Sequence, residues 1–174
     1  MPYFGKYRGS VTDNVDPMQM GRLMVQVPDI SSSSPSTWAL PCFPVTGQSA
    51  GLWVLPAVGA GVWVEFEQGD QDYPIWTGCF PGSSSEVPTE AKNGMPSSPS
   101  MILQTLGNHS IVLSDVAGSA GGIILKTADG SKIEINSTAI TISNGQGAEI
   151  KLEGAKVSVT GQPVTMNDGA LEVS

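Results

Sequence analysis

The chain has 174 residues, of which 40 % are hydrophobic and 14 % charged, a composition that excludes a disordered acidic tail. Eight lysines and arginines stand against sixteen aspartates and glutamates, which gives a formal net charge of −8. This balance argues against nucleic acid as a ligand, because phosphates are bound by basic surfaces.

The N-terminal sequence lacks the charged-then-apolar order of a signal peptide, and no apolar run approaches the ~20 residues of a membrane span. We therefore expect the chain to be assembled in the cytoplasm.

Residues 1–82 contain every Trp, Tyr and Phe of the chain. Strand patterns occur at Phe4–Val11, Gly21–Val27, Trp38–Phe43, Trp53–Leu55, Val62–Glu67 and Ile75–Phe80, and no stretch has the apolar period of a helix. Alternation in the fifth pattern places Val62, Val64 and Phe66 on one face. Short strands in this number predict a small closed barrel, because closure removes exposed edges.

Residues 83–100 are rich in Ser and Pro and have no apolar period, so they are predicted to link residues 1–82 to a second domain at 101–174.

Residues 101–174 contain a repeat of aliphatic pairs, with one residue between the two members and starts 7 to 12 residues apart. The pairs are Ile111 and Leu113, Ile123 and Leu125, Ile133 and Ile135, Ile140 and Ile142, Ile150 and Leu152, Val157 and Val159, Val164 and Met166, and Leu171 and Val173. Charged residues keep to the alternate positions, so each strand is predicted to have one apolar and one solvated face.

A strand with two inward side chains cannot build a core for itself. The short repeat therefore predicts three chains wound around one another, with these sixteen side chains in a shared core. An ordinary β-sandwich or meander is the alternative.

Several motifs in residues 5–82 resemble the phage baseplate assembly protein V and VgrG spike family, in the family's order. They are Gly5-Lys6-Tyr7-Arg8-Gly9, Asp16-Pro17, Gly21 to Pro28, Trp38 to Cys42, Pro56 to Asp70, and Tyr73 to Cys79. The resemblance implies an all-β chain: an oligonucleotide/oligosaccharide-binding (OB) fold barrel as collar, followed by a trimeric intertwined β-helix needle. The implied function is structural: a homotrimeric central spike of a contractile injection machine that pierces the target envelope and meets a membrane only on firing.

The chain lacks three features found in some relatives: a hub domain before the barrel, a lysozyme domain after it, and an HxH motif that binds axial iron. The resemblance therefore implies a separate hub protein at the N-terminal side and a separate PAAR-type tip protein at the C-terminal end. The tip protein is expected to bind the last seven residues, Asp168, Gly169, Ala170, Leu171, Glu172, Val173 and Ser174.

No catalytic, metal or cofactor site is predicted. The single histidine, His109, is expected to pack or to form hydrogen bonds, with an axial ion or water site as the alternative. Cys42 and Cys79 are expected to be buried thiols, with a disulfide or reactive site as the alternative.

The alternative function is a baseplate-associated hydrolase of peptidoglycan or surface glycan. Paired acids among Glu65, Glu67, Asp70 and Asp72 are its candidates, although their alternation with apolar residues favours a solvated strand face and turn.

Overall fold

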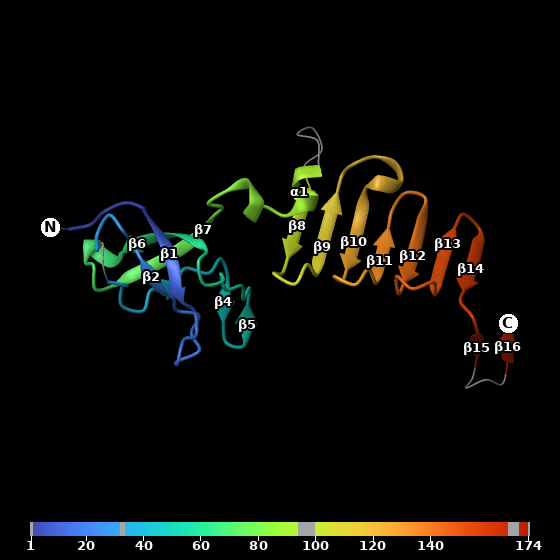
Figure 1. The fold of residues 1–174 in the computed structure, drawn as a ribbon, viewed down its shortest axis with the longest axis horizontal. Coiled ribbons are helices and arrows are strands. Elements are labelled where there is room, and N and C mark those ends of the chain that lie inside the picture. The colour runs from blue at the N-terminus through green and yellow to red at the C-terminus, as the bar shows by residue number, and fades with distance from the viewer. Residues whose placement is uncertain (1, 32–33, 94–99, 167–170, 174) are drawn as a thin grey trace. The chain divides into compact units, whose positions relative to one another are not determined.

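The computed structural model describes residues 2–31, 34–93, 100–166 and 171–173, and the chain divides into a first unit, Met1–Glu86, and a second unit, Val87–Ser174 (Figure 1). Nearly all regular elements are strands. Helical segments are short: η1 (Glu67–Gly69), η2 (Ser84–Glu86), α1 (Thr89–Asn93) and η3 (Gly118–Ala120). Within the described residues, none is long and apolar enough to cross a membrane.

The first unit is built on a five-stranded sheet in the order β2-β1-β6-β7-β3. Its strands are β1 (Tyr7–Asp13), β2 (Met24–Gln26), β3 (Leu40–Pro41), β6 (Gly61–Phe66) and β7 (Pro74–Phe80). All neighbours are antiparallel except β3 and β7, and a separate hairpin joins β4 (Thr46–Gly47) to β5 (Ala50–Gly51).

The strands predicted at Val62–Glu67 and Ile75–Phe80 agree with β6 and β7 to within one residue at each end. The strand predicted at Trp53–Leu55 is wrong. Trp53 instead packs its ring 5.3 Å from that of Phe43, so its apolar signal reflects side-chain packing rather than strand pairing. The predicted Trp38–Phe43 strand shortens to β3, where Pro41 has no N–H to donate.

The core of the first unit lies on the inner face of this sheet. The predicted face of β6 is confirmed, because Val62 and Val64 are fully buried and Phe66 is 8 % exposed. They pack in one cluster with Leu23 and Val25. Each such side chain contributes about 1.5–3 kcal/mol when it leaves water.

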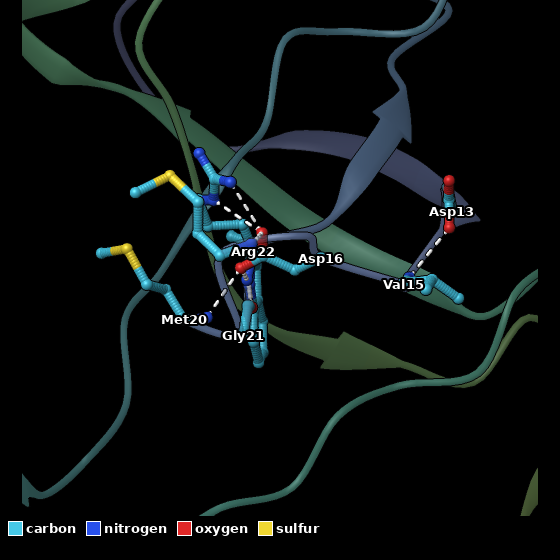
Figure 2. A network of polar contacts seen from close by, with 8 residues as sticks. Asp13, Val15, Asp16, Met20, Gly21 and Arg22 are labelled. Carbon is cyan, nitrogen blue, oxygen red and sulfur yellow. Dashed lines mark hydrogen bonds and ion pairs between the residues drawn. The ribbon is translucent and has the colours of Figure 1, made fainter.

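The loop between β1 and β2 is organised around the carboxylate of Asp16 (Figure 2). The carboxylate accepts hydrogen bonds from the backbone amides of Met18 (2.9 Å), Met20 (2.8 Å) and Arg22 (3.2 Å), and from the Arg22 guanidinium through Nε (3.0 Å) and Nη2 (2.6 Å). Gly21 completes the turn at φ +78°, where a Cβ would lie 2.9 Å from the Phe43 ring. These contacts explain why Asp16, Gly21 and Arg22 occur together in the sequence motif.

The hydrogen bonds from the Arg22 side chain, followed by those from the backbone amides, hold the pKa of Asp16 well below its usual range. Since the folded-state pKa is depressed, this carboxylate stabilises the fold above its unfolded pKa of about 3.9, and the contribution is lost as the pH falls below that value.

We therefore expect the melting temperature of the wild-type chain to exceed that of Asp16→Asn most at pH 7, because the amide cannot carry the charge that Arg22 binds. The difference should shrink as the pH falls from 4 towards 2. Thermal unfolding followed by circular dichroism at each pH measures it, and a constant difference from pH 7 to pH 2 contradicts the account.

The second unit contains a seven-stranded antiparallel sheet whose strands follow one another in chain order (Figure 1). They are β8 (Ser100–Gln104), β9 (Ser110–Ser114), β10 (Gly122–Lys126), β11 (Lys132–Ile135), β12 (Ala139–Ser143), β13 (Glu149–Glu153) and β14 (Lys156–Thr160). Two further strands, β15 (Val164–Met166) and β16 (Leu171–Val173), pair with each other.

Side-chain amides hold two of the turns. The Asn136 side-chain oxygen accepts hydrogen bonds from the amides of Thr138 and Ala139, both at 2.9 Å, and that of Asn144 accepts one from Ala148 at 3.0 Å. All eight predicted aliphatic pairs fall in strands β9 to β16. The pairing through β14 is a meander within one chain, so the winding of three chains around one another stays a prediction.

Candidate trimer interface and tip

One face of the seven-stranded sheet is entirely aliphatic in its two central rows, and we call it the aliphatic face. Cross-strand pairing aligns Met101, Leu113, Ile123, Ile135, Ile140, Leu152 and Val157 in the first row. It aligns Leu103, Ile111, Leu125, Ile133, Ile142, Ile150 and Val159 in the second. The rows include twelve of the predicted core residues and add a pair on β8, Met101 and Leu103, that the sequence analysis missed.

None of the described residues forms a second layer over the aliphatic face. All its side chains are at least 40 % exposed, and Met101 at one edge of the sheet reaches 72 %. In the first unit, by contrast, Val62 and Val64 have the same alternation and are fully buried. A sheet with one apolar face needs a second layer, and an exposed patch of this size marks an interaction surface.

The opposite face is less solvated than the sequence predicts. Val112 and Thr141 are only 7 % and 8 % exposed, and Ser110 and Ala139 are buried as well. Thr141 pairs with Glu134 on one side and with Lys151 on the other, so two longer side chains cover it. The prediction of a uniformly solvated face is therefore wrong where a small residue lies between long cross-strand neighbours.

The segment before the sheet is bound to this opposite face. The helix α1 contacts β8, and Glu90 forms an ion pair of 3.0 Å with Lys126 on β10, which lowers the pKa of the Glu90 carboxyl. The central row under this segment is apolar, with Ile102, Val112 and Ile124, whereas the same row continues with polar side chains from β11 onward. The row is thus apolar from β8 to β10, the part of the sheet that α1 and Glu90 contact, and polar on the strands beyond it.

Two family models match the chain. Residues 7–80 match the type VI secretion system/phage-baseplate injector OB domain, and residues 100–172 match the phage baseplate V C-terminal trimerisation domain. The chain belongs to the phage baseplate V family. No curated protein matches it.

The family models assign a domain type to each of the two units. The first unit of this baseplate V protein is an OB domain, and the aliphatic face lies in its trimerisation domain, which supports a homotrimer. The protein is thus a spike component of a phage or type VI secretion baseplate, in a family of structural proteins, and so a part of a virion or injection particle.

The predicted tip-binding residues are only partly within the described structure. Asp168, Gly169, Ala170 and Ser174 lie outside the described residues. The backbone of Leu171, Glu172 and Val173 forms β16, which pairs with β15 in the order Val164 with Val173 and Met166 with Leu171.

His109 lies in the turn between β8 and β9 and forms hydrogen bonds there. Its Nδ1 accepts one from the amide of Ala128 at 3.4 Å, and its own amide donates to Thr105 Oγ1 at 3.2 Å. Among the residues described in the structure, no cluster of three His, Cys, Asp or Glu side chains could hold a metal ion. These contacts agree with the hydrogen-bonding interpretation of His109.

The prediction of buried thiols is wrong, since Cys42 and Cys79 are both free and exposed. Both lie where strands end and core packing stops. Cys42 follows the last residue of β3, where its amide donates to Trp76 O at 2.9 Å, and Cys79 is the penultimate residue of β7.

The four acids considered for glycan cleavage lie on a strand and a turn of the OB domain. Glu65 forms an ion pair of 2.8 Å with Lys6, and the Asp70 carboxylate accepts a hydrogen bond from the amide of Asp72 at 3.1 Å. These local roles account for both carboxylates without a substrate.

A lysine on the aliphatic face should prevent trimer formation. Ile142→Lys would place three ammonium groups in the shared core, each at a cost of several kcal/mol. Thr160→Lys is the matched control, because Thr160 is exposed and pairs with Glu149, so the change should stay within about 0.5 kcal/mol. Sedimentation velocity measures the trimer fraction, and equal losses in both variants contradict the assignment of the faces.

Proposed function

We propose that this protein is the central spike of a contractile tail or injection machine, a homotrimer that joins a hub protein to a PAAR-type tip protein and pierces the target envelope. The observation that carries the proposal is the aliphatic face, which no described element of its own chain covers. Seven strands spaced ~4.8 Å apart extend this face over about 30 Å. Three such faces turned inward would bury one another and leave the charged faces in water.

The proposed spike is assembled in the bacterial cytoplasm, with the first unit as the collar that meets the hub and the second unit as the needle. The resemblance of the chain to the spike family supports a hub protein and a PAAR-type tip protein as its partners. Glycan hydrolysis remains the alternative function, but no described site favours it.

Folding of the second unit and trimer formation should be one event. Ordering each residue costs about 1–2 kcal/mol, and the aliphatic face returns its full burial energy only when all three copies cover it. We expect sedimentation equilibrium to give a trimer, and dilution to unfold the second unit together with the loss of the trimer, while the first unit keeps its own strands. A monomer whose circular dichroism retains the strand signal of both units would refute the proposal.

Removal of residues 168–174 should abolish binding of the tip protein and leave hub binding unchanged. The deletion takes away the predicted tip-binding residues and the β16 partner of β15, whereas the collar is untouched. A pull-down of the truncated trimer with the neighbouring hub and PAAR-type proteins tests this. Full retention of the tip protein, or loss of the hub protein, would contradict it.

A further inference from the structure

An arginine stacks on two aromatic rings at the surface of the first unit. The Arg8 guanidinium on β1 lies 5.5 Å from the ring centroid of Trp63 on β6 and 5.2 Å from that of Phe80 on β7. The two rings are 4.9 Å apart, centroid to centroid. Arg8 is exposed and both rings are partly exposed, so the cluster faces solvent.

A glycine lies opposite each aromatic residue of this cluster. Gly61 pairs with Phe80, and a Cβ at Gly61 would lie 2.7 Å from the Phe80 ring. Gly78 pairs with Trp63 and adopts φ +149°. Gly61 therefore lets the Phe80 ring lie against β6, in the surface on which Arg8 stacks, whereas a Cβ at Gly78 would meet nothing within 4 Å.

Among the described residues, Arg8 is the one basic residue of the first unit whose side chain forms no ion pair with a carboxylate. The unit has three basic residues, of which Lys6 pairs with Glu65 and Arg22 pairs with Asp16. The Arg8 guanidinium forms no ion pair or hydrogen bond with any described residue. Stacking uses the faces of the guanidinium and leaves its N–H edges free, and these edges match a carboxylate in bidentate geometry.

The same unit presents an acidic segment at the far end of the β6–β7 hairpin. The turn Glu67–Asp72 joins the two strands, and its carboxylate residues Glu67, Asp70 and Asp72 are exposed. The pair of Gly61 with Phe80 closes the opposite end of the hairpin. The hairpin thus has carboxylates at its tip and the stacked arginine towards its base.

We propose that Arg8 binds a carboxylate of the turn Glu67–Asp72 on the neighbouring copy, so that three such contacts close the collar into a ring. Three-fold closure requires a head-to-tail contact between two different patches of each copy, and the unit offers two patches of opposite charge. The trimerisation domain holds the collars at high effective concentration. The ring rests on the proposed homotrimer, but not on the hub or the tip protein.

A carbodiimide tests the contact directly, because it joins a lysine amine to a carboxylate only where the two touch. The Arg8→Lys variant of the full chain keeps the positive charge and introduces the amine. We expect covalent dimers and trimers on denaturing gels, with linked peptides that contain position 8 and residues 67–72. The wild-type chain, which retains Lys6, and the variant that combines Arg8→Lys with Glu67→Gln, Asp70→Asn and Asp72→Asn should lack this product.

An arginine-selective dicarbonyl reagent tests the unaltered Arg8. In the wild-type trimer Arg8 should react about tenfold more slowly than in the Glu67→Gln, Asp70→Asn, Asp72→Asn variant, as expected for one charge-assisted contact. Arg22, which Asp16 already binds, should react equally in both and serves as the internal control.

Sedimentation distinguishes a failure of the proposed homotrimer from a failure of the ring alone. A chain that is monomeric before cross-linking overturns the proposed homotrimer and the ring with it. Intact trimers that give no inter-chain product, that link position 8 to another segment, or that show equal Arg8 reactivity in both proteins overturn the ring alone.

Discussion

The structure of the second unit depends on one constraint: its sheet of seven strands has a fully aliphatic face, and no described residue of the chain forms a second layer over it. The backbone hydrogen bonds of its inner strands are satisfied within the chain. The aliphatic side chains, by contrast, stay largely exposed, so the sheet by itself does not form a core. Apolar patches of this size are rarely left exposed to water and mark interaction surfaces. Association is therefore part of the fold and not an addition to it.

In the first unit, the apolar face of the sheet is buried within one chain. Its strands alternate in the same way, but the sheet covers its own apolar face, and loops such as the one held by Asp16 and Arg22 fix the entry to β2. Every Trp, Tyr and Phe of the chain belongs to this unit, and Phe66 and Trp76 are buried in its core. The aliphatic face has none, as suits side chains that must repeat along a narrow shared interior.

Alternation and spacing are local properties, and the sequence predicts them well. The aliphatic pairs from Ile111 onward and the inward face of β6 follow from period-two patterns alone. Met101 and Leu103 fit the same pattern, ten residues before Ile111 and Leu113, but lie beside the Ser/Pro-rich linker and were missed for that reason. Neighbours across strands are not local: Thr141 is buried because pairing places Glu134 and Lys151 beside it. The five contacts of Asp16 likewise depend on a loop geometry that no periodicity encodes.

The sequential order of β8 to β14 has a consequence for how such a protein changes length. Each strand turns back beside its predecessor, so loss or duplication of one hairpin leaves every remaining strand with its direction and its faces unchanged. One hairpin adds two layers, or about 10 Å. The length of the sheet can therefore change in steps of one hairpin, and the sequences of the remaining strands need not change.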